Sequence, residues 1–325
     1  MKLISNAVVY ALSANHDLAV SVCKCLGTTL GDVHLAKFPS GEIMASPIET
    51  VRGKQVFIIQ STCPPVNDNI METLIFIDAV RRASAREITV IIPYFGYARQ
   101  DRKSKAREPI SSKLVADLLT TAGADRVMTF DLHAAQIQGF FSCLEDDLSA
   151  IPLLGHVLYN DKDVNKEKLV VVSPDHGGVN RARKIAEKLN TPIAIIDKRR
   201  NSQYQPEVMN IIGDVNGKDC MIVDDMIDSA GSAVAASNAL RNAGAQKIMM
   251  VCTHPVFSDP AYERLTTSKA FSKLYVTDSI PLPKRFAENK ELNIHVCSLA
   301  PVIAEAILAI SNETPVSDVY EMYKD

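Results

Sequence analysis

The chain has 325 residues, of which 47% are hydrophobic and 22% charged, and its formal net charge is −3 at pH 7. This length allows about two domains, and the composition allows each of them to bury a core. The small negative charge gives no reason to expect nonspecific nucleic-acid binding through the whole surface, so any anion binding must come from local basic clusters.

The sequence predicts neither a signal peptide nor a membrane span. The opening stretch MKLISNAVVYAL is too short and too polar downstream for a signal peptide, and no run of about 18 apolar residues occurs. The seven cysteines include no C-x-x-C pair, which is typical of a reduced protein. We therefore expect a cytoplasmic protein with neither a membrane nor a nucleic acid as partner.

Short apolar runs alternate with helical patterns along the chain, which is typical of parallel α/β sheets. Between the first two expected strands, Ile70, Leu74, Ile77 and Val80 recur at helical spacing, preceded by the potential N-caps Asn67 and Asp68. Because the strand runs are apolar throughout, we expect helices on both faces of the sheets. The expected strands are 55–61, 88–94, 127–132, 170–173, 193–197, 221–224 and 248–252, and a terminal helix is expected at 300–311.

A domain boundary is expected in the polar stretch 149–168, which lacks a strong period. It divides the chain into domains 1–150 and 151–325, with the last helix and tail able to pack back on the first domain. A weak internal repeat relates QVFIIQS…ITVIIPYF to DCMIVDD…IMMVCTHPVF. Two unrelated βαβ units could look equally similar, so both interpretations stay open.

The motif VDDMIDSAGS, residues 223–232, carries the most chemistry and stands between an expected strand and an expected helix. Asp224 and Asp225 lie at the carboxyl end of the strand, where open α/β sheets bind ligands. Residues 228–232 place small side chains at a helix N-terminus, whose unpaired N–H groups favour a phosphate. The acidic pair suits vicinal hydroxyls or a metal. The motif therefore predicts a sugar-phosphate pocket, and an ordinary capped helix is the alternative.

This motif resembles the ribose 5-phosphate loop of type I phosphoribosyltransferases and of ribose-phosphate diphosphokinases, the PRPP synthetases. The resemblance implies two tandem parallel-sheet α/β domains of the type I phosphoribosyltransferase-like fold. The loop alone does not separate the two families. The residues that the resemblance assigns to ribose 5-phosphate binding here are Asp224, Asp225, Asp228, Ser229, Ala230, Gly231 and Ser232.

The run YARQDRKSKAR, residues 97–107, has five basic residues within nine positions. On its own such a cluster is also typical of a solvated surface. It follows an expected strand, however, and it resembles the ATP segment of the synthetases. The resemblance implies that Arg99, Gln100 and Asp101 bind the nucleotide.

The stretch KFPSGEI, residues 37–43, resembles the segment that a neighbouring synthetase subunit adds to the adenine pocket. The resemblance implies that Phe38 stacks on the base and that Ser40 and Glu42 contact it. Ser40 stands where the family often has Asn or Asp, which predicts weaker or water-mediated contacts there.

FDLHAAQIQGFF, residues 130–141, is similar to a signature of the synthetases. A lone histidine after a strand is more often a packing residue, but the resemblance implies that His133 binds ATP and reaches its Mg²⁺ ion. Ser142 stands where an acidic residue is usual, so no metal ligand is expected at that position.

Two further strand ends complete the resemblance. Asp175 precedes Gly177 and Gly178, which permit close backbone approach, and the resemblance implies that this aspartate is the second Mg²⁺ ligand. The next strand ends in DKRR, followed by the polar loop 201–207 that closes over the substrates in the family. The resemblance assigns catalytic roles on the transferring diphosphate to Lys198 and Arg199, and contact with the ribose phosphate to Arg200. Cations so placed would offset charge in the transition state.

The resemblance covers nearly the whole chain and implies a ribose-phosphate diphosphokinase for nucleotide biosynthesis. Such an enzyme transfers the β,γ-diphosphate of Mg-ATP to the C1 hydroxyl of ribose 5-phosphate, giving PRPP and AMP. The sequence has no G-x-x-x-x-G-K-[ST] loop and no G-x-G-x-x-G before a helix, which excludes a P-loop kinase and argues against a dinucleotide dehydrogenase. One alternative is a phosphoribosyltransferase, which would not use the Arg99 and His133 segments. The other is a non-catalytic synthetase-associated regulatory subunit.

The resemblance also implies a homo-oligomer, a hexamer built from dimers, with phosphate and ADP as regulators. Arg107 matches a residue that lines the regulatory site. Ala106 and Ala135 replace serine or another small residue of many relatives, and the tail PVSDVYEMYKD departs from the usual ending. These departures predict altered phosphate activation and ADP inhibition.

Overall fold

The structure, a computed structural model, describes residues 6–199 and 208–324. Its contacts divide the chain into two compact units. Unit 1 comprises residues up to Ser149 together with Ser279–Pro281 and Ser298–Lys324, and unit 2 comprises Ala150–Asp278 and Leu282–Cys297. The terminal helix therefore belongs to the same unit as the N-terminal half of the chain.

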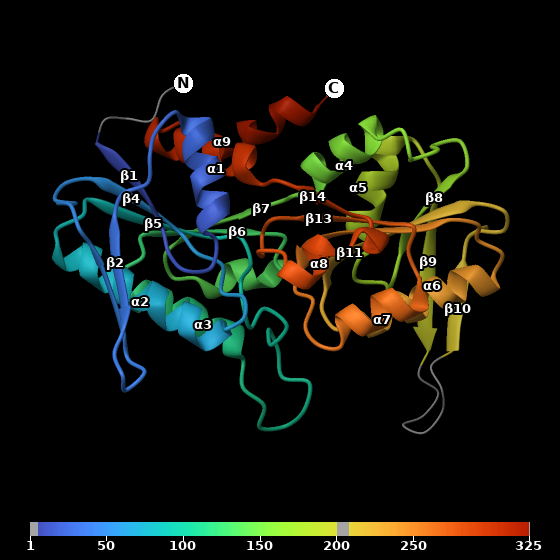
Figure 1. Ribbon diagram of the computed structural model, residues 1–325, viewed down its shortest axis with the longest axis horizontal. Helices are drawn as coiled ribbons and strands as arrows, with labels where there is room; N and C mark the ends of the chain where they lie inside the picture. Colours follow the sequence, from blue (N-terminus) through green and yellow to red (C-terminus); the bar gives the residue numbers. More distant parts are fainter. Residues whose placement is uncertain (1–5, 200–207, 325) are drawn as a thin grey trace. The chain divides into compact units, whose positions relative to one another are not determined.

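Unit 1 has a five-stranded parallel sheet in the order β1-β4-β5-β6-β7. Helices α1 and α9 cover one face of this sheet, and α2 and α3 cover the other (Figure 1). A separate antiparallel hairpin is formed by β2 and β3. The elements of unit 1 are β1 Ala7–Ala11, α1 His16–Leu26, β2 Val33–Lys37, β3 Ile43–Pro47, β4 Gln55–Ile59, α2 Val66–Arg82, β5 Glu87–Ile92, α3 Ser111–Ala122, β6 Arg126–Phe130, β7 Leu144–Leu148 and α9 Ala300–Ser311, with 3₁₀ helices η1 Ala135–Phe140 and η3 Val316–Tyr323.

Unit 2 has a seven-stranded sheet in the order β10-β9-β8-β11-β12-β13-β14. Only the pairing of β9 with β10 is antiparallel. Helices α4 and α5 lie on one face and α6 and α7 on the other (Figure 1). The elements are α4 Ile151–Asn160, β8 Leu169–Ser173, α5 Val179–Leu189, β9 Ile193–Arg199, β10 Val208–Ile212, β11 Asp219–Ile227, α6 Gly231–Asn242, β12 Ile248–Pro255, α7 Ala261–Ser268, β13 Lys273–Thr277, α8 Lys284–Glu288, β14 Ile294–Cys297 and the 3₁₀ helix η2 Lys290–Leu292.

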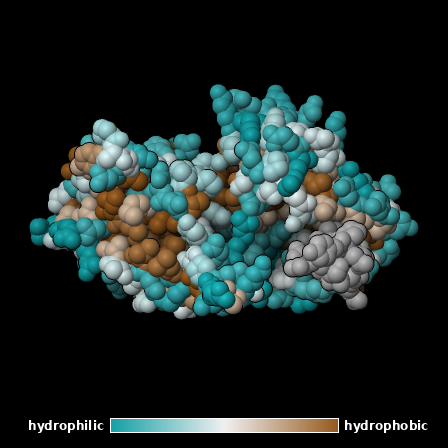
Figure 2. All heavy atoms as spheres, turned by 90° about the horizontal axis from the view of Figure 1, so that it is seen from below, coloured by the Kyte–Doolittle hydropathy of each residue, from teal (hydrophilic) through white to brown (hydrophobic). Residues whose placement is uncertain are grey.

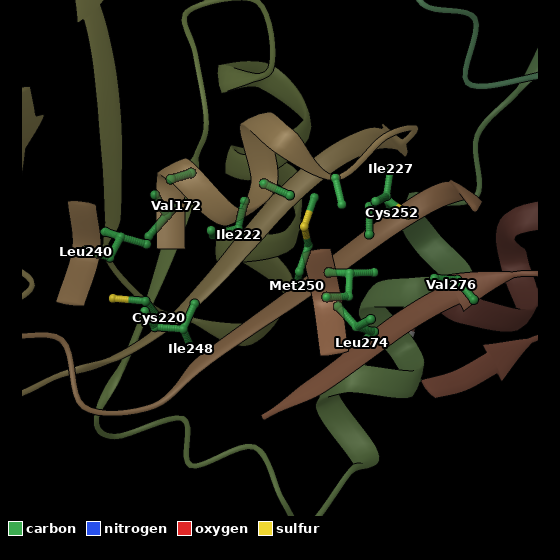
Figure 3. Packing of buried hydrophobic residues seen from close by; sticks show 14 of the residues in the cluster. Val172, Cys220, Ile222, Ile227, Leu240, Ile248, Met250, Cys252, Leu274 and Val276 are labelled. Atoms are coloured by element: carbon green, nitrogen blue, oxygen red, sulfur yellow. The ribbon is translucent and has the colours of Figure 1, made fainter. Parts of the chain in front are cut away.

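The cores explain why the apolar runs form central strands. All five residues of β4 and of β8 are buried, as expected for strands covered on both faces. In unit 2 a cluster from β8, β11, β12 and β13 packs against α6, as Figure 3 shows for Ile222, Met250 and Leu240. Cys220 and Cys252 belong to this cluster and act as small hydrophobic residues. The expected class, two α/β units with parallel sheets, is confirmed.

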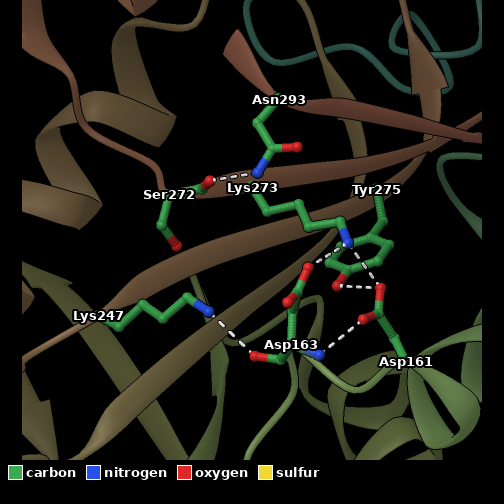
Figure 4. A network of polar contacts seen from close by, with 7 residues as sticks. All are labelled: Asp161, Asp163, Lys247, Ser272, Lys273, Tyr275 and Asn293. Atoms are coloured by element: carbon green, nitrogen blue, oxygen red, sulfur yellow. Dashed lines mark hydrogen bonds and ion pairs between the residues drawn. The ribbon is translucent and has the colours of Figure 1, made fainter. Parts of the chain in front are cut away.

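A polar network attaches the loop after α4 to the far strands of the unit 2 sheet (Figure 4). The Lys273 ammonium lies 2.7 Å from an Asp161 carboxylate oxygen and 3.0 Å from one of Asp163. The Tyr275 hydroxyl donates to the same oxygen of Asp161 at 2.9 Å. Burial, the largest single influence, raises the pKa of Asp161, but the hydrogen bonds from Lys273, the Asp163 backbone and Tyr275 outweigh it and lower this pKa to about 2.

Replacing Lys273 with methionine is expected to destabilise unit 2 by about 2–3 kcal/mol near pH 7, because it leaves Asp161 without its cation. A carboxyl whose pKa is lowered on folding contributes stability above its unfolded pKa of about 4 and loses it as the pH falls toward 2. The variant should therefore lose less stability than the wild type in this acid range. Urea unfolding followed by circular dichroism at several pH values measures both effects. The control Lys284→Met removes a lysine whose side chain is 87% exposed and should change little; equal losses in the two variants would contradict the assignment.

Candidate active site

In unit 1 the segments after β5 and β6 leave the same edge of the sheet, because these strands are parallel neighbours. A hydrogen bond joins them: the Gln136 amide, in the segment after β6, donates to the Asp101 carboxylate at 2.7 Å. The Phe95 and Phe141 rings also pack together, with centroids 5.5 Å apart. The structure thus brings together the two segments expected to bind ATP. Arg99 and His133, one on each segment, are exposed to solvent.

The segment that carries Arg99 is also held from α3. The backbone carbonyl of Gln100 accepts a hydrogen bond from the Ser112 hydroxyl at 3.0 Å. The side-chain oxygen of Gln100 accepts a further hydrogen bond from the Ser111 hydroxyl. Gln100 therefore serves the local structure of unit 1, and the expectation that it also contacts a nucleotide stays a prediction.

The stretch 37–43 forms the turn of the β2–β3 hairpin. The Phe38 N–H donates to the Glu42 carbonyl at 2.8 Å, and Gly41 has a positive φ of 94°, which favours glycine. The Ser40 hydroxyl donates to the Glu42 carboxylate at 2.6 Å. Phe38 is 47% exposed, which leaves much of its ring uncovered at the hairpin turn.

Asn67 and Asp68 are not N-caps, so that prediction is wrong. Helix α2 begins at Val66 without a side-chain cap, so both residues lie inside its first turn and their side chains reach other segments. The Tyr97 hydroxyl donates to Asn67 at 2.6 Å, and the Lys37 ammonium lies 2.9 Å from Asp68. The first turn of α2 thereby holds both the basic segment and the hairpin.

In unit 2 the strands β9, β8 and β11 are neighbours, and the chain order reverses direction between β8 and β11. Such a switch point, at the carboxyl ends of parallel strands, is where open α/β sheets bind ligands. Asp175 follows β8, and Lys198 and Arg199 end β9. Of Lys198 and Arg199 the structure describes the backbone, and Arg200 with the expected loop 201–207 lies outside the described residues.

The expected end of the strand before the acidic pair needs a correction. Strand β11 does not end at Asp224 but continues to Ile227, because β12 pairs with it as far as Ile227 opposite Pro255. Its pairing with β8 stops at Ile222 opposite Val172. Asp224 and Asp225 therefore lie just beyond the end of the β8 ladder, still at the switch point.

Asp175 is held by its own turn. The Gly178 N–H donates to a carboxylate oxygen of Asp175 at 2.9 Å, and the Ser173 hydroxyl donates to its backbone carbonyl at 2.6 Å. Its neighbour His176 has a ring nitrogen 3.0 Å from the Asp197 carboxylate on β9. The ends of β8 and β9 are thus linked. The Asp175 side chain is exposed to solvent.

Sequence reasoning missed Arg181, which faces the acidic pair. Its guanidinium lies 3.8 Å from Asp224 and 3.7 Å from Asp225, and its side chain is only 17% exposed. Burial and the adjacent Asp225 carboxylate raise the pKa of Asp224 well above its ordinary value, and Arg181 opposes this rise. One cation therefore compensates two crowded carboxylates. The run SPDHGGVNRARK, residues 173–184, contains this arginine, but the fold is needed to show which of the basic residues in the run points to β11.

The expected phosphate loop is a tight turn before a helix. Ala230 has a positive φ of 61°, a left-handed conformation that is unusual for alanine, and α6 begins at Gly231 with no side-chain cap. A second missed residue, Arg264 on α7, donates from its guanidinium to the Ser229 carbonyl at 3.0 Å and to the Ser229 hydroxyl oxygen at 3.1 Å. A Cβ atom on Gly231 would lie 3.0 Å from that guanidinium, so the close approach of Arg264 favours glycine there.

Within residues 6–199 and 208–324, no group of three or more His, Cys, Asp and Glu side chains is arranged to hold a metal ion. No helix in that part of the chain is both long enough and apolar enough to cross a membrane. The seven cysteines, all within the described ranges, are free thiols.

Two known domain families match the chain. Residues 7–123 match the family described as the N-terminal domain of ribose phosphate pyrophosphokinase. Residues 201–321 match the family described as the phosphoribosyl synthetase-associated domain. Both descriptions refer to enzymes that synthesise phosphoribosyl pyrophosphate.

Full-length relatives agree with these matches. A Lactococcus lactis protein named ribose-phosphate pyrophosphokinase 1 is 50% identical over 319 residues, which cover 98% of this chain and 97% of the relative. An Oceanobacillus iheyensis protein named ribose-phosphate pyrophosphokinase is 49% identical over 317 residues and 98% of both chains. The crystal structure of phosphoribosylpyrophosphate synthetase from Mycobacterium smegmatis is similar with a TM-score of 0.87 and 40% identity, covering 95% of this chain and all of that one.

Proposed function

The chain belongs to the ribose-phosphate pyrophosphokinase family, and from that premise we propose that it is a working ribose-phosphate diphosphokinase. It would transfer the β,γ-diphosphate of ATP to the C1 hydroxyl of ribose 5-phosphate, giving PRPP and AMP. The observation that carries this proposal is the strand–turn–helix 223–232, which joins a compensated acidic pair to an uncapped helix N-terminus. It combines groups suited to sugar hydroxyls and to a phosphate.

The sugar phosphate is assigned to unit 2. Carboxylates of Asp224 and Asp225 are acceptors for the vicinal hydroxyls of a ribose. Backbone N–H groups at the start of α6, which lack intrahelical partners, suit the dianionic 5-phosphate. Because the Ser229 hydroxyl oxygen already accepts from Arg264, its own proton is available for donation to that phosphate. The positive guanidinium beside the loop adds to the attraction.

The nucleotide is assigned to unit 1, at the edge that carries Arg99 and His133. Arg99 offers a planar set of N–H donors suited to phosphate oxygens. Asp101, held by Gln136, and Gln100 are the other proposed contacts. Phe38, Ser40 and Glu42 on the hairpin turn are proposed to contact an adenine, and the exposed ring of Phe38 supports this because bases stack on aromatic faces.

The metal required by such a reaction is Mg²⁺ carried by ATP. Mg²⁺ is usually bound by one or two carboxylates together with substrate phosphates and waters, and the exposed carboxylate of Asp175 fits this pattern. We propose Asp175 and His133 as the protein groups that meet the ion. When bound, the metal neutralises charge on the transferring diphosphate.

The chemical step is a displacement at the β-phosphorus. The C1 oxygen of ribose 5-phosphate forms the new bond to that phosphorus, the bond to the α,β-bridging oxygen breaks, and AMP leaves while the C1 hydroxyl loses its proton. We propose that Lys198 and Arg199, at the end of β9, stabilise the charge that develops on the diphosphate. Arg200 is proposed to bind the ribose phosphate.

The decisive experiment is to follow AMP and ADP from ATP, with and without ribose 5-phosphate, in Mg²⁺ and phosphate. AMP that depends on the sugar, with no ADP, is the expected result. ADP formation would indicate transfer of a single phosphoryl group and overturn the proposal. Failure of folded protein to release AMP would favour the non-catalytic regulatory subunit.

Arg264→Ala is expected to raise the KM for ribose 5-phosphate about tenfold while changing the KM for ATP less than twofold. The variant loses two hydrogen bonds that hold Ser229 and a positive charge beside the proposed phosphate. Steady-state kinetics with each substrate varied in turn gives the comparison. Arg285→Ala is the matched control, because Arg285 is exposed and binds Asp259 outside the loop. Equal changes in both KM values would argue against a role for Arg264 at the phosphate.

We further propose a homo-oligomer, a hexamer built from dimers. Along α3 and its N-cap, Ile110, Leu114 and Leu118 recur at helical spacing and are 36%, 59% and 40% exposed. Figure 2, a view from below, shows hydrophobic side chains gathered on the face of unit 1 that is turned toward the viewer. An apolar area of this kind is typical of subunit contacts. The mass measured by sedimentation tests the assembly, and a monomer would contradict it.

Regulation by phosphate and ADP is also proposed, with Arg107 as a contact. The alanines at positions 106 and 135 predict that both responses differ from those of relatives with serine. A phosphate titration of activity with and without ADP measures both responses.

We also propose a cytoplasmic location, which suits the seven free thiols because a reducing compartment keeps cysteines reduced.

A further inference from the structure

The hydroxyl group of Tyr320 in the C-terminal tail contacts the end of β7 in unit 1. After α9 the chain forms the 3₁₀ helix η3, which packs beside α9 (Figure 1). From this helix the Tyr320 hydroxyl oxygen accepts a hydrogen bond from the Ser149 N–H at 2.6 Å. Ser149 directly follows β7. The tail thus contacts a backbone group at the end of β7, the edge strand of the unit 1 sheet.

The contact continues toward the proposed nucleotide segment. The Ser149 hydroxyl donates to a carboxylate oxygen of Asp131 at 2.8 Å, and the Asp131 N–H donates to the Leu148 carbonyl at 2.8 Å. Next in the chain, the Leu132 N–H donates to the Asp147 carboxylate at 3.2 Å. The two residues before His133 are therefore both fixed to the end of β7.

The backbone at this corner needs such support. Asp131 has a positive φ of 41°, a conformation that aspartate tolerates better than most residues but still at a cost. A residue held in this region persists only when its surroundings fix it. The direction in which His133 leaves β6 depends on that corner. The hydrogen bonds of Ser149 and Asp131 are hence in a position to set it.

The hydroxyl of Tyr320 is also in a polar, partly buried place. Burial, together with the nearby carboxylates of Asp131 and Asp147, raises the pKa of Tyr320 to about 12, although the hydrogen bond from Ser149 opposes this. The hydroxyl therefore stays uncharged at neutral pH. An uncharged hydroxyl can accept from Ser149 without adding a negative charge beside two carboxylates.

We propose that Tyr320 is a positioning residue, which acts through Ser149 and Asp131 to hold His133 in the conformation that meets Mg-ATP. The proposal rests on the proposed function for the meaning of His133, but not for the contact itself. It predicts that the tail influences nucleotide use selectively. Among the described residues, those proposed to bind ribose 5-phosphate belong to unit 2 and do not take part in the hydrogen bonds given above.

Tyr320→Phe removes the hydroxyl and keeps the ring. We expect the KM for Mg-ATP to rise about fivefold to tenfold, because the partly buried Ser149 N–H loses its hydrogen bond to Tyr320 and the corner at Asp131 is held less firmly. The KM for ribose 5-phosphate should change less than twofold. Tyr159→Phe, which removes a hydroxyl from a 46% exposed tyrosine of unit 2, is the control and should leave both constants unchanged. An equal rise in both constants for Tyr320→Phe would show a merely structural role and overturn the proposal.

A double-mutant cycle tests the path through Ser149. Ser149→Ala removes the bond to Asp131 and should raise the KM for Mg-ATP by a similar factor. If both residues act through one corner, the double variant should be no worse than about twofold beyond either single variant. Fully multiplicative effects would mean that the two residues act independently, which contradicts the proposal.

A readout without catalysis separates this proposal from the proposed function. In the full-length protein with labelled histidine, the His133 ring signals, assigned with His133→Gln, should shift in Tyr320→Phe and not in Tyr159→Phe. If the wild type releases no AMP but these signals shift, the proposed function fails and the positioning contact stands. Unchanged His133 signals overturn the positioning role whatever the activity.

Discussion

Lys198→Ala is expected to lower turnover by about 10²–10³-fold while ribose 5-phosphate binds almost as tightly as before. The backbone of Lys198 ends β9, opposite Met209 of β10 and next to Asp197, which faces His176. That position lies one strand away from the switch point between β8 and β11, because β9 is the next neighbour of β8. In the proposed role, a cation there would act on charge that appears on the diphosphate only as the bond to AMP breaks. Its removal should therefore reduce kcat rather than the binding of the sugar.

Two measurements together make this prediction sharp. Rapid-quench or coupled assays give kcat, and calorimetry gives the affinity for ribose 5-phosphate without turnover. Lys284→Ala is the control, because that lysine belongs to unit 2 and its side chain is 87% exposed. A variant with weakened sugar binding and normal turnover would show that Lys198 binds substrate and does not stabilise the transition state.

The expected strands are present, and most begin or end within about two residues of their predicted limits. Residues 170–173, for example, fall inside β8, and the terminal helix spans Ala300–Ser311 as predicted. The strands are buried on both faces, and the terminal helix is buried over most of its surface. Their sequences are therefore mainly apolar, which makes such elements easy to predict. The family resemblance is confirmed by the matching family models and relatives. It could be predicted because its motifs are long and occur in order over nearly the whole chain.

Weaker local signals led to omissions and errors. The hairpin β2–β3 and the edge strand β14 were not expected, since their residues alternate less clearly and several are exposed. Strand β13 was also not expected, although four of its five residues are buried. Asn67 and Asp68 are good caps by residue type, but Pro65 and Val66 start α2 earlier. Their side chains bind Tyr97 and Lys37 instead. Residue type alone does not reveal such tertiary partners.

The residues of the candidate site also fall into two groups, those that the sequence predicted and those that it missed. Asp224 was predicted as a site residue because it stands at the end of a strand run, and Asp175, at another strand end, was assigned by the family resemblance. Arg181 and Arg264 were missed because their importance depends on which helix face turns toward β11 and Ser229. Tyr320 was missed because its partner, Ser149, is far away in the sequence. Contacts between distant segments require the sheet order and the packing of the helices, which local patterns do not contain.

Arg181→Ala is expected to weaken ribose 5-phosphate binding at pH 7 about 100-fold and to destabilise unit 2 by about 3 kcal/mol. Both effects follow from leaving Asp224 and Asp225 crowded together without their cation. The pKa of Asp224 is raised by burial and by Asp225 and is held down by Arg181. The variant should therefore keep Asp224 protonated to a higher pH. A protonated carboxyl is a poorer acceptor for the sugar hydroxyls.

The pH dependence has a definite sign. Because the folded-state pKa of Asp224 lies above its unfolded value, this group favours the folded state at low pH and loses that contribution as the pH rises through the folded pKa. In Arg181→Ala this loss should extend to higher pH. The affinity for ribose 5-phosphate should rise with pH in Arg181→Ala, because Asp224 ionises and becomes a better acceptor. The difference in this affinity between the variant and the wild type should therefore become smaller as the pH rises.

Calorimetric titration with ribose 5-phosphate between pH 6 and 9, with urea unfolding at the same pH values, measures both trends. Arg183→Ala provides the control, since Arg183 lies on the same helix but is exposed, and it should match the wild type. A loss of affinity by the same factor at every pH would mean that Arg181 contacts the sugar phosphate directly. Arg181 would then be a ligand of the substrate, and the titration of the acidic pair would have no part in binding.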